Sequence, residues 1–261
     1  RRGGSITVGM DTVQQASVTA AILVIGDEIL SGRTKDKNIG YIAEYLTNIA
    51  IDLREVRVVP DVEAEIVAGL DALRARYTYV FTTGGIGPTH DDITADSVAK
   101  AFGAAIDVDP RAVAMMSERY KPGELNAARL RMARIPAGAA LIANPISKAP
   151  GFRIGNVIVM AGVPSVMQAM LDEIAPTLAT GVRMLSETVD AAGLPEGIYA
   201  GGLAELAAAH PGVSVGSYPS FTGAGFSNQI VARSKDAALL AAAVEAIRHM
   251  VAQLHADRAP I

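Results

Sequence analysis

The stretch Tyr79-Val80-Phe81-Thr82-Thr83-Gly84-Gly85-Ile86-Gly87-Pro88-Thr89-His90-Asp91-Asp92-Ile93-Thr94 decides the fold of this chain. It starts with β-branched and aromatic residues, as strands do, and passes through glycines and two carboxylates to a helix start. Glycines lack a Cβ atom, so the backbone N–H groups of such a loop can approach an anion, and the following helix adds its positive end. The stretch therefore predicts a strand, a phosphate-binding loop and a helix.

The two carboxylates favour a ligand site over a glycine-rich turn that serves packing alone. Asp91 and Asp92 would repel a bound anion unless a cation lay between them, and Mg²⁺ usually bridges one or two carboxylates to substrate phosphates. We therefore expect a divalent metal, Mg²⁺ or a similar ion. The alternative is that one of these residues caps the helix that begins near Thr94. The loop has neither a Walker A sequence nor the G-x-G-x-x-G spacing, which disfavours ATP hydrolysis by the usual P-loop route.

Composition excludes several functional classes. With 261 residues, the chain is long enough for one sizeable domain and a smaller one. It has no cysteine, which excludes disulfides, thiolate metal sites and thiol catalysis. Its 23 basic and 27 acidic residues give a net charge of −4 without a basic tract, so nucleic-acid binding is not expected.

Neither a membrane span nor a signal peptide is expected. The apolar segments are short and fall below the roughly 18 residues that a span requires. Residues 1–19 lack the apolar core of a signal peptide, and we expect them to form a flexible N-terminal lead. The sequence thus predicts a cytoplasmic protein without membrane partners.

Strand and helix patterns alternate along residues 20–180. Apolar runs at 20–25, 53–59, 77–83 and 156–161 predict strands. Helical spacing follows at 37–49, 62–73, 95–102, 109–120, 124–133 and after 164. Repeated units of this kind predict an α/β fold with a mostly parallel sheet and helices on both faces.

Acidic residues follow the predicted strands. Asp27 and Glu28 come after the first strand, Asp61 after the second and the 84–92 loop after the third. Ligands of such sheets collect at the carboxyl ends of the strands, so these three loops should converge at one edge. The alternatives are a helix cap for Asp61 and a solvated turn for Asp27 and Glu28.

A second loop rich in turn residues is expected at 141–152, and Lys148 is the cation there that could meet a phosphate. The alternative for Lys148 is a solvated surface lysine. After Thr180 the order becomes strand, helix, strand, strand, helix, which predicts a small α+β domain over 181–261 with turns at 211–212 and 222–225.

Four motifs together resemble a known family. They are Gly26-Asp27-Glu28-Ile29-Leu30-Ser31-Gly32 with Asp36 and Asn38, then Thr82 to Thr94, Ala149-Pro150-Gly151-Phe152, and Gly162-Val163-Pro164. They resemble the molybdenum-cofactor biosynthesis (MoaB/Mog, molybdopterin-binding) domain, in the branch found at the N-terminus of competence/damage-inducible protein A (CinA). The resemblance spans roughly residues 20–180 and implies a three-layer α/β/α domain and a homo-oligomer, a dimer or trimer. The segment after Thr180 is similar to the middle domain of the competence protein.

The resemblance also implies a ligand and site residues. Cofactor-biosynthesis members hold a phosphorylated pterin, and CinA-like and FAD-synthase-like relatives are linked to metal-dependent cleavage of ADP-ribose-type or flavin nucleotides. By the matching motif, Thr83, Gly84, Gly85 and Gly87 would hold phosphate, and from this chain's own loops we also expect Thr89, Ser147 and Lys148 to take part. Metal ligands are expected at Asp27 and Asp92, and catalytic residues at Asp92 and Asp61. The family often has Gly-Thr where this chain has Ser147-Lys148, which affects the substrate more than the fold.

Three functions remain open from the sequence. The first is a domain that binds a molybdopterin or nucleotide and cleaves a pyrophosphate bond with a metal. Such a site would act through charge neutralisation and a water positioned by an aspartate. The second is a binding or interaction protein without turnover. The third is a cofactor-synthesis enzyme that inserts molybdate or transfers an adenylyl group.

Overall fold

The computed structural model of the chain describes residues 17–121, 123–222 and 225–258. The chain divides into two compact units between Gly181 and Val182. The predicted flexible lead lies outside the described residues except for its last three positions. Among these, Thr19 opens the first strand, so the ordered chain begins slightly before the predicted boundary.

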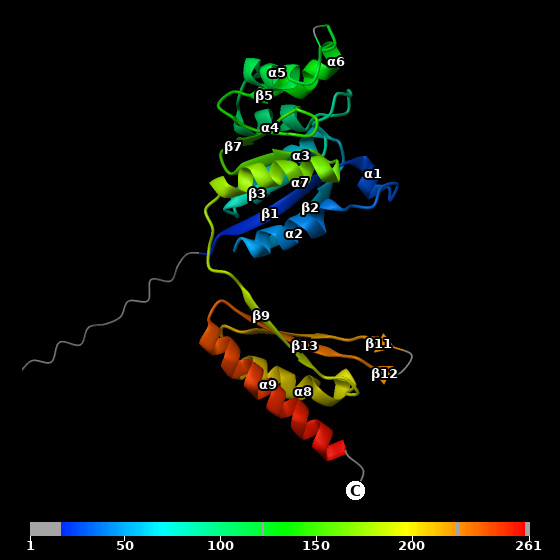
Figure 1. Cartoon of the computed structure of the whole chain (residues 1–261), viewed down its shortest axis with the longest axis vertical. Helices are drawn as coiled ribbons and strands as arrows, with labels where there is room; N and C mark the ends of the chain where they lie inside the picture. The colour runs from blue at the N-terminus through cyan, green and yellow to red at the C-terminus, as the bar shows by residue number, and fades with distance from the viewer. Residues whose placement is uncertain (1–16, 122, 223–224, 259–261) are drawn as a thin grey trace, which may run out of the picture. The chain divides into compact units, whose positions relative to one another are not determined.

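A six-stranded sheet forms the centre of the first unit (Figure 1). Its order is β2 (Asp52–Val59), β1 (Thr19–Ile25), β3 (Tyr79–Thr83), β8 (Val157–Met160), β7 (Gly151–Ile154) and β6 (Ala140–Ile142). The first four strands run parallel, β7 is antiparallel to β8, and β6 is antiparallel to β7, so β6 runs in the same direction as the first four. The predicted mostly parallel sheet is confirmed.

Helices cover both faces of this sheet, because the strands bury side chains on both sides. Ile22 and Val24 of β1 pack with α2 (Asn38–Asn48) and α7 (Pro164–Ile174). The alternate residues Leu23 and Ile25 pack on the opposite face. That face is covered by α3 (Glu63–Arg74), α4 (Thr94–Phe102) and α5 (Pro110–Ser117). The three-layer α/β/α class is therefore confirmed.

Two local predictions in the first unit were wrong. The helix expected at 124–133 is one turn, α6 (Ala127–Leu130), followed by a 3₁₀ turn and by β5 (Arg134–Pro136), which pairs with β4 (Ile106–Val108). Asn126 starts the short helix by accepting a hydrogen bond from the N–H of Arg129. The loop expected at 141–152 includes most of β6 and the start of β7. Because these strands are short, their formation depends on pairing with neighbouring strands more than on the local sequence pattern.

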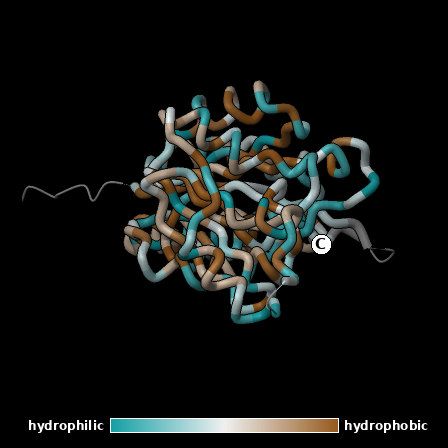
Figure 2. The backbone as a smooth tube through the Cα atoms, turned by 90° about the horizontal axis from the view of Figure 1, so that it is seen from above, coloured by the Kyte–Doolittle hydropathy of each residue, from teal (hydrophilic) through white to brown (hydrophobic). Residues whose placement is uncertain are grey.

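The second unit has the predicted order of strand, helix, strand, strand, helix. Its three-stranded antiparallel sheet runs β10 (Ser214–Tyr218), β13 (Gln229–Ser234) and β9 (Leu185–Asp190). The helices are α8 (Glu196–Ala209) and α9 (Ala237–Arg258). Between β10 and β13 there is also a small strand pair, β11 (Phe221–Thr222) and β12 (Gly225–Phe226), which contains the two ends of the turn predicted at 222–225, and residues 223–224 of that turn lie outside the described residues. The backbone in Figure 2 changes between hydrophobic and hydrophilic residues over short segments, as amphipathic elements require.

Helix α9 is the one helix in the described residues that is long and apolar enough to cross a membrane by length and composition. Core helices pass the same test. Its buried residues Leu240, Ala243, Val244, Ile247 and Val251 pack with Ile230 of β13 and Tyr199 of α8. This packing is typical of an amphipathic core helix.

Substitution on α9 tests its packing. Leu240 is 4% exposed, and its neighbour Leu239 is 43% exposed. We expect Leu240→Ala to destabilise the second unit by about 2–5 kcal/mol because it leaves a cavity. Leu239→Ala is the matched control and should cost less than about 1 kcal/mol. Calorimetric unfolding measures both, and equal losses would contradict a one-sided core helix.

Candidate functional site

The loops that follow the parallel strands meet at one edge of the sheet. The backbone N–H of Asp27, after β1, donates a 2.9 Å hydrogen bond to Oδ2 of Asp61, after β2. The N–H of Gly84, at the end of β3, donates to the carbonyl of Met160 at the end of β8. The predicted convergence of the loops is confirmed, and α3 begins at Glu63 with Val62 as its cap, so Asp61 does not cap it.

The acidic loops form a cluster of like charges. The pKa of Asp61 is raised, first by partial burial and then by the negative charges of Asp27, Glu28 and Asp91, while the bond from the Asp27 N–H opposes the shift. Asp27 and Glu28 lie in the first turn of α1 (Asp27–Leu30), a one-turn helix where a loop was expected. Within the described residues, no group of three or more acidic or histidine side chains is arranged to hold a metal ion.

Packing alone requires two of the loop glycines. Gly84 has φ +102°, and a Cβ atom there would lie 2.2 Å from the carbonyl oxygen of Ile25. Gly85 has φ +67°, and a Cβ there would lie 2.2 Å from Oγ1 of Thr94. Thr94 in turn donates a 2.9 Å hydrogen bond from its hydroxyl to the carbonyl of Gly84. The glycines thus press the loop against β1 and α4, as the packing interpretation expects, and also leave its backbone bare.

The Asp92 side chain forms hydrogen bonds within the glycine loop. Its Oδ2 accepts hydrogen bonds from the N–H of Thr89 at 2.9 Å and from the Thr89 hydroxyl at 2.6 Å. A Cβ atom at Gly87 would lie 2.6 Å from the same oxygen. Because α4 begins at Thr94 without a side-chain cap, the interpretation of Asp91 or Asp92 as a helix cap was wrong.

A cleft of about 560 Å³ opens beside this loop. This volume is within the range of ligand sites, about 300–1,000 Å³. Gly84, Gly85, Gly87 and Asp92 line it together with the first residues of α7, where the helix has its positive end. The glycine loop lies close to Gly162, since a Cβ at Gly162 would lie 3.2 Å from Cα of Gly84. Further lining residues are Glu28, Thr34, Met132, Asn144, Ser147 and Pro164.

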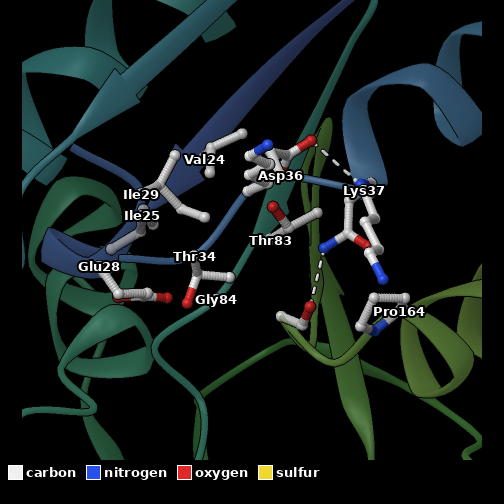
Figure 3. A pocket seen from close by; sticks show the side chains of 13 residues that line it. Val24, Ile25, Glu28, Ile29, Thr34, Asp36, Lys37, Thr83, Gly84 and Pro164 are labelled. Atoms are coloured by element: carbon white, nitrogen blue, oxygen red, sulfur yellow. Dashed lines mark hydrogen bonds between the residues drawn. The ribbon is translucent and has the colours of Figure 1, made fainter. Parts of the chain in front are cut away.

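A smaller hollow of about 230 Å³, which we call the inner pocket, adjoins the cleft (Figure 3). Thr83 lies in the middle of the residues drawn there, with Val24, Ile25 and Ile29 on one side and Pro164 on the other. Among the described residues, Oγ1 of Thr83 and Oδ1 of Asn38 are buried without a hydrogen-bond partner. Such atoms cost about 1–3 kcal/mol each until a partner meets them.

The structure separates the predicted phosphate-binding residues. Gly84, Gly85, Gly87 and Ser147 line the cleft. Thr83 lines the inner pocket instead, and Thr89 is not among the residues lining either hollow because its N–H and hydroxyl bind Asp92.

Lys148 is directed elsewhere. Its Nζ lies 2.7 Å from Oε2 of Glu118, and it lines a separate small hollow with that residue. Its backbone has φ +66°, which lies in the left-handed region. The ion pair is partly exposed, with 36% of the Lys148 side chain and 59% of the Glu118 side chain accessible, which agrees with the alternative of a surface lysine. The phosphate contact of Lys148 stays a prediction.

The predicted metal ligands and catalytic residues lie in two different places, the cleft and the acidic cluster. Asp92 lines the cleft, whereas Asp27 and Asp61 are bound to each other in the neighbouring acidic cluster and are not among the residues lining either hollow. Glu28 lines both hollows and was not assigned a site role from the sequence. Its position after the first strand is the signal that could have identified it.

Asn38, Lys35 and Lys37 in the inner pocket were also missed. Asn38 stood in the quoted motif, but only the fold shows that its Nδ2 donates a 2.8 Å hydrogen bond to the carbonyl of Gly162. Asp36 fixes the start of α2 by accepting hydrogen bonds from the N–H groups of Asn38 and Ile39.

Each of the two units matches a known family model. Residues 21–180 match the family described as a probable molybdopterin binding domain. Residues 183–259 match the middle domain of FAD synthase.

Individual relatives agree with these matches. A curated protein of Pyrobaculum calidifontis is 35% identical over 211 residues, which cover 77% of this chain and 80% of that protein. A CinA-like protein of Desulfosudis oleivorans is 35% identical over 209 residues, but the match covers only 51% of its length. The crystal structure of the protein CinA with unknown function from Thermoplasma acidophilum has a TM-score of 0.59 and 34% identity, covering 62% of this chain and 99% of that one.

Substitution of Gly84 tests the loop packing. We expect Gly84→Ala to destabilise the first unit by about 3 kcal/mol or more, because the methyl group meets a backbone carbonyl as well as an unfavourable φ. Gly32 is the control, since it also has a positive φ, +72°, but open space around it. Gly32→Ala should cost about 1–2 kcal/mol. Thermal unfolding compares the two, and equal losses would exclude the contact with Ile25 as the cause.

The acidic cluster predicts a pH dependence of stability. The pKa of Asp61 is higher in the folded state than in the unfolded chain, so the folded state binds this proton more tightly. The resulting contribution to the free energy of unfolding is complete below the unfolded pKa, about 3.9, and is lost as the pH rises through the folded pKa. Asp61→Asn keeps an oxygen for the Asp27 N–H and removes the charge. We expect this variant to be more stable than the wild type at pH 7, by less than about 1 kcal/mol, and to lose this advantage near pH 4.

The control for this measurement is Glu44→Gln, an exposed substitution on α2. It should show the same pH dependence as the wild type in urea unfolding. A loss of stability for Asp61→Asn at pH 7 would show that its charge is stabilising, contrary to this interpretation.

Proposed function

The chain belongs to the molybdopterin-binding (MoaB/Mog) domain family, and on that premise we propose that its first unit binds a phosphorylated pterin or nucleotide in the cleft. We further propose that it hydrolyses a pyrophosphate bond in ligands of the ADP-ribose or FAD type, with a divalent metal. The match of the second unit to the middle domain of FAD synthase supports a flavin or related nucleotide among the candidates.

The observation that carries this proposal is the chemistry of the residues that line the cleft. They include the bare backbone of Gly84, Gly85 and Gly87 and the first residues of α7, where the helix has its positive end. Both suit phosphate oxygens. Glu28 and Asp92 add carboxylates to the same cleft, which would repel a phosphate unless a cation came with it.

These residues fit a metal ion that arrives with the ligand better than one that resides in the protein. Mg²⁺ commonly uses one or two carboxylates and completes its shell with phosphate oxygens and water. Glu28 and Asp92 would hold it, whereas the predicted pair was Asp27 and Asp92. Bound there, the ion would supply neutralisation of the phosphoryl charge.

The chain's own groups would then perform the remaining steps. Backbone N–H groups of the glycine loop would hold the phosphates in place, and the carboxylate oxygen of Glu28 that does not hold the ion would accept a proton from the attacking water. The water oxygen bonds to one phosphorus while the bond from that phosphorus to the bridging oxygen breaks. The bridging oxygen leaves on the other phosphate, so ADP-ribose and water give AMP and ribose 5-phosphate. Asp61, predicted as catalytic, would act by holding the Asp27 loop.

The test is incubation with ADP-ribose and with FAD, with and without Mg²⁺, followed by phosphorus NMR. We expect AMP to appear only with the metal, and Glu28→Gln to lower the rate by about 10²-fold or more. Glu65→Gln, an exposed carboxylate on α3, is the matched control and should leave the rate unchanged.

Other outcomes distinguish the alternatives. Saturable binding without products would favour a non-catalytic binding protein. Turnover of a molybdopterin precursor with molybdate or ATP would favour a cofactor-synthesis enzyme. Failure to bind any of these ligands would overturn the proposal. The homo-oligomer and the cytoplasmic location stay predictions that size-exclusion chromatography with light scattering and cell fractionation can test.

A further inference from the structure

We infer that Arg131 is a positioning residue of the proposed site. It holds the tip of the glycine loop, residues 88–92, so that one carboxylate oxygen of Asp92 stays free for a cation in the cleft. This inference rests on the proposed function, which places a divalent metal beside Asp92. Arg131 was assigned no role from the sequence, since it lies 42 residues beyond Thr89 and meets the loop only in the folded chain.

The tip of the glycine loop is exposed and closed on itself. Thr89, His90 and Asp91 are exposed residues. The Asp92 N–H donates a hydrogen bond to the carbonyl of Thr89, and the N–H and hydroxyl of Thr89 donate to Oδ2 of Asp92. These bonds fix the shape of the tip, but none of them ties it to another part of the fold.

The Arg131 guanidinium supplies that attachment. Its Nε donates a 3.1 Å hydrogen bond to the carbonyl of Thr89, and its Nη2 donates a 3.3 Å hydrogen bond to the carbonyl of Asp92. Among the described residues, Arg131 is the one residue outside the glycine loop whose side chain hydrogen-bonds to the tip. Because a guanidinium is planar and rigid, two bonds to the two ends of one turn fix its position and its orientation together.

The segment that carries Arg131 is itself anchored. Arg131 opens a 3₁₀ turn that ends at the buried Ala133, whose carbonyl accepts a 2.8 Å hydrogen bond from the N–H of Asp109 at the start of α5. Arg134 then forms a two-point ion pair with Asp96 of α4, with N–O distances of 2.8 and 2.7 Å. The tip is therefore tied to a segment that two helices hold in place.

The bonding of Arg131 leaves the Asp92 carboxylate available to the cleft. Oδ2 of Asp92 is occupied by Thr89, and Oδ1 has no hydrogen-bond partner in the described part of the chain. Asp92 lines the cleft, whereas Arg131 is not among the lining residues. An ion pair between the two would have neutralised the carboxylate, but the guanidinium donates to carbonyls instead. A carboxylate fixed through one oxygen, with the other oxygen free, suits a metal ligand.

Arg74 provides a matched control in the same unit. Its Nη2 donates a 2.8 Å hydrogen bond to the carbonyl of Ala101, and its guanidinium also contacts Asp71 and the ring of Phe102. It is not among the residues lining the cleft or the inner pocket. Arg74→Ala and Arg131→Ala therefore remove the same kind of backbone support, once away from the loop and once at it.

The first measurement is amide hydrogen exchange of the full chain by NMR, which requires no ligand. We expect Arg131→Ala to speed exchange at the amides of Thr89 and Asp92 about tenfold, because the tip loses its attachment. Arg74→Ala should leave both rates as in the wild type. Arg131→Lys keeps a cation that can reach one carbonyl and should give intermediate rates. Unchanged exchange in Arg131→Ala would overturn the inference.

The second measurement is titration calorimetry with pyrophosphate at increasing Mg²⁺ concentration. Arg131→Ala should need about 10–100-fold more Mg²⁺ than the wild type for half-maximal pyrophosphate binding, as is typical when the group that orients a metal ligand is removed. At saturating Mg²⁺ its pyrophosphate affinity should return to that of the wild type. Arg131→Lys should recover part of the Mg²⁺ affinity, and Arg74→Ala should match the wild type throughout.

The contradicting outcomes separate this inference from the proposed function. If the wild type binds pyrophosphate with Mg²⁺ and Arg131→Ala has the same Mg²⁺ requirement, the inference fails while the proposed site stands. A loss of affinity that persists at saturating Mg²⁺ would mean that Arg131 contacts the phosphate itself, which also overturns a positioning role. Equal effects of Arg74→Ala and Arg131→Ala would reduce both to general destabilisation. If the wild type binds no pyrophosphate at any Mg²⁺ concentration, the proposed function fails and the role given to Asp92 fails with it.

Discussion

The close packing of Gly84 against the carbonyl of Ile25 is the contact on which the first unit's site depends. It holds the loop after β3 against the end of β1, where no side chain could fit. The loop is also held at the start of α4, where the Thr94 hydroxyl donates a hydrogen bond to the carbonyl of Gly84. Gly162, which follows β8, lies close to Gly84. The cleft is therefore built from backbone segments at fixed separations, which suits a ligand recognised through its phosphates.

The like charges beside this loop are a second constraint. Asp61 holds the backbone of Asp27 in place while lying near other carboxylates, so the protein keeps a cluster of like charges next to the glycine loop. Perturbed carboxylates of this kind occur at functional sites and in structural networks alike. Here one hydrogen bond gives Asp61 a structural role, and Glu28 and Asp92 are the carboxylates left facing the cleft.

The sequence predicts the layers of this fold well, because long amphipathic helices and continuously apolar strands leave strong periodic signals. It also predicts that the acidic loops converge, since parallel strands end at one edge. It fails for β6 and β7, whose short segments become strands through pairing, β7 with β8 and β6 with β7. It also cannot show that Lys148 forms an ion pair with Glu118, because these residues are far apart in the sequence and meet only in the folded chain. Asn38 and Thr83 likewise acquire their shared pocket only in the folded chain.

The place of β8 in the sheet has a consequence for how the protein is made. β8 lies beside β3 in the middle of the sheet, yet it is separated from β3 in sequence by α4, α5 and α6. It also leads directly into Gly162 and the first turn of α7. A nascent chain on the ribosome therefore lacks part of the lining of the cleft until these later residues emerge. The cleft is complete only after nearly the whole first unit has been synthesised.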